Sequence, residues 1–142
     1  MITNVSLANV YVSDQDAARD FYVDKLGFEL RNDVKMGDGF RWITVGVPGQ
    51  NDLEVVLYKP GPPQSPEDAE TVANLVAKGA ISGVGVHVDD CRKTFDELSA
   101  KGVTFLQEPS DRPYGVEAVL RDNSGNWLVL VEPKEYSPED FA

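Results

Sequence analysis

The fold follows from the stretch Asn9-Val10-Tyr11-Val12-Ser13-Asp14, because the chain repeats it as Gly85-Val86-His87-Val88-Asp89-Asp90. In both copies an alternating pattern ends in aspartate, and a helical pattern that stops at a glycine follows, over residues 16–26 and 91–101. Alternation with a period of two predicts a strand, and an aspartate before apolar residues at helical spacing predicts the start of a helix. Each half of the chain therefore begins with a strand and a helix.

The repeat continues beyond the helices. Strand patterns recur in the same order in both halves, at residues 28–31, 40–47 and 53–60 and again at 103–106, 116–121 and 126–133. We predict turns between them, including one over residues 33–39. Two copies are too few for a solenoid, so they are predicted to be half-domains that share one core.

Length and composition favour one folded domain. The chain has 142 residues, of which 42% are hydrophobic, enough for a core of its own. Pro60-Gly61-Pro62-Pro63 marks the joint between the halves. The predicted single domain, residues 1–142, divides into a first module at 3–60, a linker helix at 61–80, a second module at 81–133 and an acidic tail at 134–142.

The charge and the apolar pattern exclude several classes of partner. A net charge of −11 argues against binding nucleic acid or an anionic membrane surface, both of which need Lys and Arg. No apolar run approaches the ~18 to 20 residues that span a bilayer, and no signal-peptide pattern is present. The one cysteine, Cys91, is predicted to be buried on its helix and fits a reducing cytoplasm.

Alternation divides the strand side chains between two faces. One face is aliphatic and is predicted to pack under the helices with a stripe from the first helix: Val10, Val12, Ile43, Val45, Val47, Ala17, Ala18, Phe21 and Tyr22. The opposite face carries aromatic and polar groups: Leu7, Asn9, Tyr11, Phe40, Trp42, Thr44, Glu54, Val56, Gly83, His87, Glu117, Val119, Arg121, Trp127 and Val129. A solvated sheet would carry more Lys and Thr, and a plain core would lack the charged groups. An apolar hollow with a few polar groups is typical of a small-molecule site.

Several motifs together resemble the vicinal oxygen chelate superfamily. They are the doubled βαβββ order, Val-x-Asp before each helix, Phe-Tyr-x-x-x-Leu-Gly-Phe at 21–28 and Asp-x-x-Gly-Asn at 122–126. The superfamily includes glyoxalase I, extradiol dioxygenases, fosfomycin-resistance enzymes and bleomycin-resistance proteins, and the resemblance covers residues 3–133. It implies an α+β fold in which two βαβββ modules form a cupped, eight-stranded mixed sheet with helices on the outer face. It also implies a homodimer, since members often complete their cups across the interface.

The resemblance also bears on metal binding. In metal-dependent members, His, Gln or Glu ligands come from the first and fourth strands of each half. The matching positions here are Leu7, Val56, Gly83 and Val129, whose side chains have no lone pair to donate. The sequence therefore favours the branch without metal or other cofactor, exemplified by the bleomycin-resistance proteins, which sequester a drug without altering it.

The resulting hypothesis is a binding protein for a small aromatic or amphipathic molecule, with antibiotic sequestration as one instance. The expected ligand-binding residues are Asn9, Tyr11, Phe40, Trp42, Glu54, His87, Tyr114, Glu117, Arg121 and Trp127. Aromatic rings would stack on the ligand and the polar groups would orient it. No catalytic residue is assigned.

Alternatives stay open on the sequence alone. A shifted metal site of Glu54, His87 and Glu117 would suit a metal-dependent lyase or dioxygenase, and His87 with a glutamate such as Glu117 would suit a metal-free isomerase. His87 also fits a neutral histidine bonded within the cavity, Glu117 and Arg121 fit an ion pair, and both tryptophans fit a core. A pure interaction module is a third class. The sequence names neither the ligand nor whether one chain closes the cup.

Overall fold

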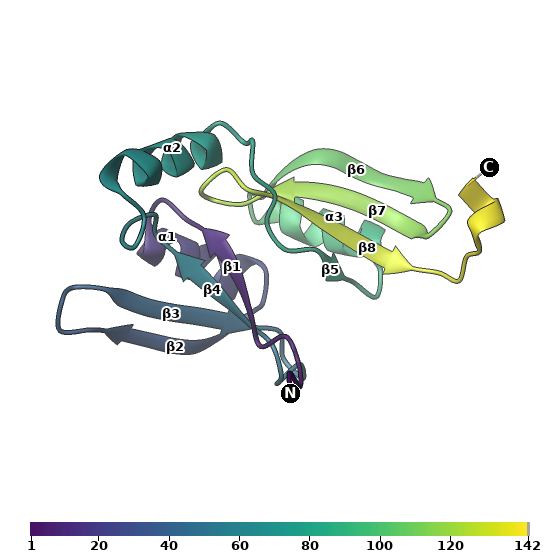
Figure 1. The fold of residues 1–142 in the computed structure, drawn as a ribbon. Coiled ribbons are helices and arrows are strands. Elements are labelled where there is room, and N and C mark those ends of the chain that lie inside the picture. Colours follow the sequence, from purple (N-terminus) through teal and green to yellow (C-terminus); the bar gives the residue numbers. More distant parts are fainter. Residues whose placement is uncertain (142) are drawn as a thin grey trace.

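The computed structural model describes residues 1–141 and contains two βαβββ modules joined by a helix (Figure 1). The first module consists of β1 (Leu7–Tyr11), α1 (Gln15–Asp20), the π-helical turn η1 (Phe21–Lys25), β2 (Glu29–Lys35), β3 (Arg41–Gly46) and β4 (Glu54–Tyr58). The helix α2 (Pro66–Ala77) leads to the second module, which consists of β5 (Val86–His87), α3 (Cys91–Ala100), β6 (Thr104–Arg112), β7 (Gly115–Arg121) and β8 (Trp127–Pro133). A 3-10 turn, η2 (Pro138–Phe141), follows in the tail. The predicted α+β class is confirmed.

The eight strands form two four-stranded mixed sheets with the same topology. Their orders are β1-β4-β3-β2 and β5-β8-β7-β6. In each sheet the first strand pairs in parallel with the fourth, and the remaining pairs are antiparallel. Within the described residues β1 and β5 are edge strands, each paired on one side only. The sheets lie side by side, and α2 crosses above the joint between them (Figure 1).

Each helix begins at a side-chain cap that its sequence predicts. Asp14 accepts a hydrogen bond from the backbone N of Ala17 at 2.9 Å, and Asp90 accepts one from Lys93 at 3.0 Å. These bonds satisfy amide groups that the first turn of a helix leaves free. Gly27 closes the first helical segment with a φ of 81°. That left-handed conformation is one that side chains disfavour.

The aliphatic faces of both sheets meet in one core beneath the helices. Val10, Val12, Ile43 and Val45 are at most 2% exposed, and one cluster of buried residues joins them to the helical aromatics and to Leu120, Leu128 and Leu130 of the second sheet. The prediction is wrong for two residues that it assigned to this buried face. Val47 is 37% exposed because β3 ends at Gly46, and Ala17 is exposed on the solvent side of α1.

Strand lengths differ from the prediction at three places. In β6 the strand continues to Arg112, where the pattern predicted residues 103–106. Residues 33–35 belong to β2 rather than to a turn, because they pair with β3 as far as Lys35 opposite Arg41. The second half has only two residues of regular strand in β5, where the pattern predicted a strand over 83–88. Gly83 and Gly85 precede these two residues and supply no side chain to pack against the sheet.

The second module is fastened to the first by the turn at residues 122–126, hereafter the Asp122 turn. The side chain of Asp122 is buried, and its Oδ1 accepts hydrogen bonds from the backbone N of residues 124, 125 and 126 at 2.9–3.0 Å. Its Oδ2 accepts the hydroxyl of Tyr22 at 2.7 Å and Nδ2 of Asn126 at 2.9 Å. Asn126 Nδ2 also donates to the carbonyl of Tyr11 at 2.7 Å. The turn, which leads into β8, is therefore bonded to η1 through Tyr22 and to β1 through Tyr11.

The tail folds back onto the second module. The Phe141 ring stacks on Tyr114 with centroids 6.2 Å apart and meets Tyr136 edge-on at 5.4 Å. The last residue of the tail predicted at 134–142 lies outside the described residues. No helix within residues 1–141 combines the length and apolar character needed to cross a membrane.

Candidate functional site

The side chains that the sequence assigned to the hollow lie on the sheet faces turned away from the core. On the first sheet, register pairs Leu7 with Glu54, Asn9 with Val56, Tyr11 with Tyr58 and Thr44 with Val56. We call this the first cup face: Leu7, Asn9, Tyr11, Asn32, Val34, Trp42, Thr44, Glu54, Val56 and Tyr58. The second cup face, on the other sheet, comprises His87, Gln107, Glu117, Val119, Arg121, Trp127, Val129 and Val131.

An aromatic cluster occupies one end of the first cup face. The ring of Tyr58 meets Tyr11 edge-on with centroids 6.1 Å apart and Phe40 at 5.7 Å. Nε2 of Gln64 donates to the Tyr11 hydroxyl at 3.0 Å and so fixes that ring. An open pocket of about 200 Å³ lies here, lined by Asn9, Tyr11, Tyr58, Gly61, Pro63 and Gln64.

Four residues of this pocket were missed by the sequence analysis: Tyr58, Gly61, Pro63 and Gln64. Tyr58 shares its strand face with Glu54 and Val56, so alternation alone could have found it. Gln64 lies in the loop before α2, where no periodic pattern indicates which way a side chain points.

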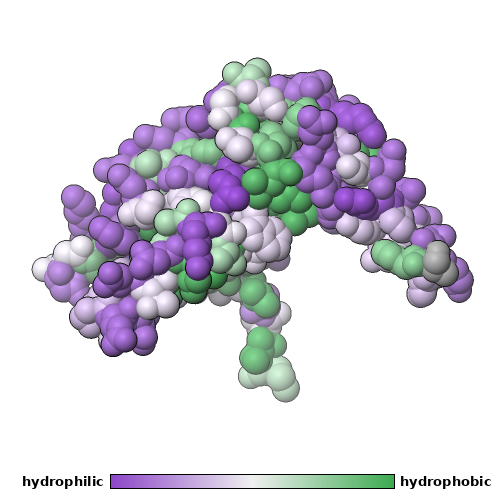
Figure 2. All heavy atoms as spheres, turned by 90° about the horizontal axis from the view of Figure 1, so that it is seen from above, coloured by the Kyte–Doolittle hydropathy of each residue, from purple (hydrophilic) through white to green (hydrophobic). Residues whose placement is uncertain are grey.

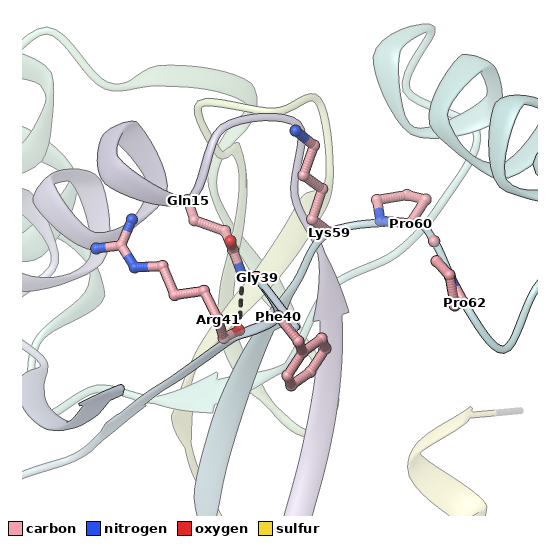
Figure 3. Close-up of a pocket in the computed structure, with 8 residues that line it drawn as sticks. Gln15, Gly39, Phe40, Arg41, Lys59, Pro60 and Pro62 are labelled. Atoms are coloured by element: carbon pink, nitrogen blue, oxygen red, sulfur yellow. Dashed lines mark hydrogen bonds between the residues drawn. The ribbon is translucent and has the colours of Figure 1, made fainter. Parts of the chain in front are cut away.

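A second pocket, of about 170 Å³, opens on the other side of the same loop (Figure 3). Phe40 and Arg41 leave β3 on opposite sides, and Lys59 stands above the strands (Figure 3). The amide of Gln15 donates to the carbonyl of Arg41 at 3.3 Å and to that of Leu57 at 3.0 Å. These bonds hold the start of α1 against the ends of β3 and β4.

Ion pairs fix the same end of β3. The Arg41 guanidinium bonds Asp33 at 2.8 and 2.9 Å and Asp16 at 2.7 Å. The hydrogen bond from Arg41 lowers the pKa of Asp33 and that of Asp16, and the bond to Asp33 raises the pKa of Arg41 further. All three groups stay charged at neutral pH. They hold the strand end from which Phe40 projects onto the cup side.

Glu54 is held by neutral partners in the middle of the first cup face. Its Oε1 accepts the hydroxyl of Thr44 at 2.6 Å and Nδ2 of Asn32 at 3.0 Å. The same Asn32 nitrogen also donates to Thr44 Oγ1 at 3.0 Å. Thr44 itself is fully buried beneath this arrangement, so the carboxylate has a fixed direction.

Glu117, on the second cup face, has both oxygens occupied. Oε2 accepts the Tyr114 hydroxyl at 2.5 Å, and Oε1 accepts Gln107 Nε2 at 3.3 Å and Arg112 Nε at 3.4 Å. Burial acts to raise the pKa of Glu117, but the hydrogen bonds from Tyr114, Gln107 and Arg112 outweigh it and leave the pKa below its usual value. A carboxylate held ionised in this way is a weak general base at neutral pH.

Arg121 does not pair with Glu117, in contrast to one expectation. Arg121 lies at the far end of β7, opposite Trp127, and donates from Nη1 to the carbonyl of Gly125 at 2.9 Å. The cation beside Glu117 is Arg112, the last residue of β6, on the other side of the β6–β7 turn. Trp127 is 36% exposed, so on a single chain it is a surface ring rather than a core residue.

His87 is an exposed residue of the edge strand β5, opposite Val131. Its side chain has no hydrogen-bond partner among residues 1–141. The prediction of a histidine hydrogen-bonded within the cavity is therefore not met in a single chain. The imidazole lines two open hollows, one of about 380 Å³ with Val47 and Gln50 and one of about 520 Å³ beside α3.

The residues at the metal positions of the resemblance do not fit a divalent ion. Leu7 is 45% exposed on β1, Val56 is buried, and neither Gly83 nor Val129 offers a donor atom. The shifted set also fails to assemble. Within residues 1–141, no three His, Cys, Asp or Glu side chains come together in a way that could hold a metal ion.

In a single chain the two cup faces stay open. The molecule is bowed around a hollow on one side, and its hydrophilic surface is interrupted by an apolar area between the two ends (Figure 2). None of the five pockets on the described chain is lined by Trp42, Glu54, Glu117, Arg121 or Trp127, so these side chains lie on open faces rather than in a closed cavity. The structure therefore groups the predicted residues into two half-sites.

Known proteins share both the sequence and this arrangement. The family model of the Glyoxalase/Bleomycin resistance protein/Dioxygenase superfamily matches residues 4–130. The crystal structure of UcmS2 is 45% identical and superposes with a TM-score of 0.87 over 93% of this chain and 99% of that one. TnmS3, an antibiotic binding protein from Streptomyces sp. CB03234, is 32% identical, with a TM-score of 0.75 over 94% and 98% of the two chains. The uncharacterized protein YurT of Bacillus subtilis is 34% identical over 90% of this chain and 98% of its own length.

Proposed function

Because this chain belongs to the glyoxalase/bleomycin resistance protein/dioxygenase superfamily, we propose that it binds a small aromatic or amphipathic molecule in its cup without a metal ion. One observation carries the proposal. Three of the four chelating positions carry aliphatic side chains and the fourth is Gly83, on faces that otherwise carry aromatic rings and a few oriented polar groups. Such faces suit binding rather than metal-assisted chemistry.

Similarity to an antibiotic binding protein supports antibiotic sequestration as the specific form of this function. TnmS3 is an antibiotic binding protein at 32% identity, and its fold matches over almost the whole chain. The aromatic cluster around Tyr58 and the exposed Trp127 offer flat apolar surfaces to a planar ligand. Each aromatic contact of this kind stabilises a complex by about 0.5–1.5 kcal/mol beyond the area that it buries.

We further propose a homodimer in which a second copy completes each cup. The edge strands β1 and β5 have free sides within the described residues, and both cup faces are open in one chain. Leu7 and Trp127 lie on these open faces, 45% and 36% exposed, where a second copy would cover them. The only cysteine is buried, so the dimer would not rest on a disulfide, and we propose a cytoplasmic location.

Thermal unfolding with and without candidate ligands tests the function. A ligand present at about 100 times its Kd adds roughly 2.7 kcal/mol to the free energy of unfolding. A panel of aromatic antibiotics should therefore raise the Tm of the wild-type protein. The Trp42→Ala variant should respond less, whereas Phe95→Ala, altered on the helix side where Phe95 packs on Phe105, should keep the response.

Two further measurements separate binding from turnover. Mass spectrometry of the recovered ligand should return it unchanged, and elemental analysis of the purified protein should find no stoichiometric divalent metal. A converted ligand or a bound metal would support the lyase or dioxygenase alternative. Absence of any Tm shift across the panel would count against the proposed function itself.

A further inference from the structure

The two cup-face glutamates differ in how their oxygens are used. Both oxygens of Glu117 accept hydrogen bonds from side chains of its own module. Glu54 uses only Oε1, for Thr44 and Asn32, and its Oε2 has no hydrogen-bond partner within residues 1–141. Glu54 is therefore the carboxylate with acceptor capacity left over.

A β-bulge brings Asn32 to Glu54. The register between β2 and β3 shifts between Leu30 and Asn32, so that Leu30 lies opposite Val45 but Asn32 lies opposite Thr44. The shift aims the Asn32 amide at the cup face, where it reaches both Thr44 and Glu54. Bulges commonly re-aim a side chain next to a functional site.

Glu54 forms no ion pair with any Lys, Arg or His of the described chain. None of the ion pairs within residues 1–141 includes it, and its two partners are a hydroxyl and an amide. The carboxylate is half-buried beside apolar neighbours, Val56 among them. A half-buried ionised group with an open acceptor gains most from a charge-assisted donor.

We propose that Glu54 recognises a hydrogen-bond donor of the ligand, a hydroxyl or an ammonium group, through Oε2, and that Asn32 and Thr44 are the residues that position it. The inference rests on the proposed binding of an aromatic molecule in the cup. Trp42 lies two residues before Thr44 on the same face, about 7 Å along the strand, and the Thr44 hydroxyl lies 2.6 Å from the Glu54 carboxylate. A ring placed over Trp42 therefore has its edge, and a donor on that edge, within reach of Glu54.

Three naphthalene probes test the inference on the full-length protein. 2-Naphthol carries a neutral donor, naphthalen-2-ylmethylammonium carries a charged donor, and 2-methoxynaphthalene keeps the ring but has no donor. Dissociation constants come from NMR titration of the protein with each probe. At least one donor probe should bind about tenfold more tightly than the methyl ether, as expected for a hydrogen bond to a charged group. Which donor probe is preferred identifies the class of ligand.

Three variants assign the preference to Glu54. In Glu54→Gln the preference over the ether should fall to about twofold or less, since the charge is lost while the shape is kept. Thr44→Val keeps the carboxylate but removes a bond that directs it, and should lose part of the preference. Glu117→Gln is the matched control and should keep the full preference, because both oxygens of Glu117 are already occupied.

The outcomes separate this inference from the proposed function. If wild type binds the ether as tightly as both donor probes, or if Glu54→Gln keeps the preference, the inference is wrong while aromatic binding stands. If wild type binds none of the three probes, both fail. Loss of the preference in Glu117→Gln but not in Glu54→Gln would assign recognition to the other sheet and also overturn it.

Discussion

Replacing Tyr22 by Phe removes one oxygen atom and the only side-chain hydrogen bond from α1 and η1 to the Asp122 turn. Tyr22 is fully buried, and its hydroxyl lies 2.7 Å from Oδ2 of a carboxylate that is 5% exposed. Hydrogen bonds to charged groups contribute roughly 1.5–3 kcal/mol, and the buried carboxylate cannot turn to water for a replacement. The substitution leaves no cavity larger than the missing oxygen. We expect Tyr22→Phe to lower the free energy of unfolding by about 1.5–3 kcal/mol, or the Tm by about 4–9 °C.

Urea unfolding at fixed protein concentration, followed by tryptophan fluorescence, measures this loss. Trp42 and Trp127 lie in different modules, so both halves report on the transition. The matched control is Tyr58→Phe, because the Tyr58 hydroxyl has no hydrogen bond in the described chain. That variant should stay within about 0.5 kcal/mol of wild type. If Tyr22→Phe costs no more than Tyr58→Phe, the Asp122 turn does not hold the modules together in the way we describe.

Three further outcomes follow from other parts of the structure. Because Arg41 lowers the pKa of the Asp33 carboxyl in the folded state, this pair stabilises the fold above the unfolded-state pKa and ceases to do so as the pH falls through the lowered folded value. Asp33→Asn should therefore cost about 0.2–1 kcal/mol near neutral pH, and urea unfolding in acid should find no difference from wild type. Gly125→Ala should cost at least about 1–3 kcal/mol in the same assay, because φ is 119° and the new Cβ would meet a backbone carbonyl of α2. Wild-type stability in that variant would contradict the close approach. Tyr114→Phe removes a hydrogen bond that lowers the pKa of Glu117, so carbon-13 NMR titration should find that pKa raised, and an unchanged value would argue against the bond.

The sequence predicted those features that depend on local periodicity. Alternation placed Val10 and Val45 in the core and Glu54 and Glu117 on the opposite faces, because side-chain direction in a strand depends only on the parity of the position. The aspartate caps of the helices could also be predicted, because the capping side chain bonds a backbone amide only three residues away.

Features set by distant segments could not be predicted in this way. Asn32 reaches the first cup face because a bulge shifts its register, and no residue pattern near it announces that shift. Arg121 is the last residue of β7, whereas Arg112 is the last residue of β6 and pairs with Gly115 at the start of β7. Which arginine lies beside Glu117 therefore depended on the β6–β7 turn. Sequence motifs marked Tyr22 and the Asp122 turn separately, but only the fold brings them into contact across 100 residues.

The Asp122 turn makes the two halves of a doubled chain unequal. Tyr22 stands eight residues after Asp14, and the residue eight after Asp90 is Leu98, which has no hydroxyl. The tie therefore runs in one direction only, from the helix of the first copy to the turn of the second. A first half made alone would lack the acceptor of the Tyr22 hydroxyl, and a second half made alone would lack this donor to Asp122, so the contact exists only when both halves are present.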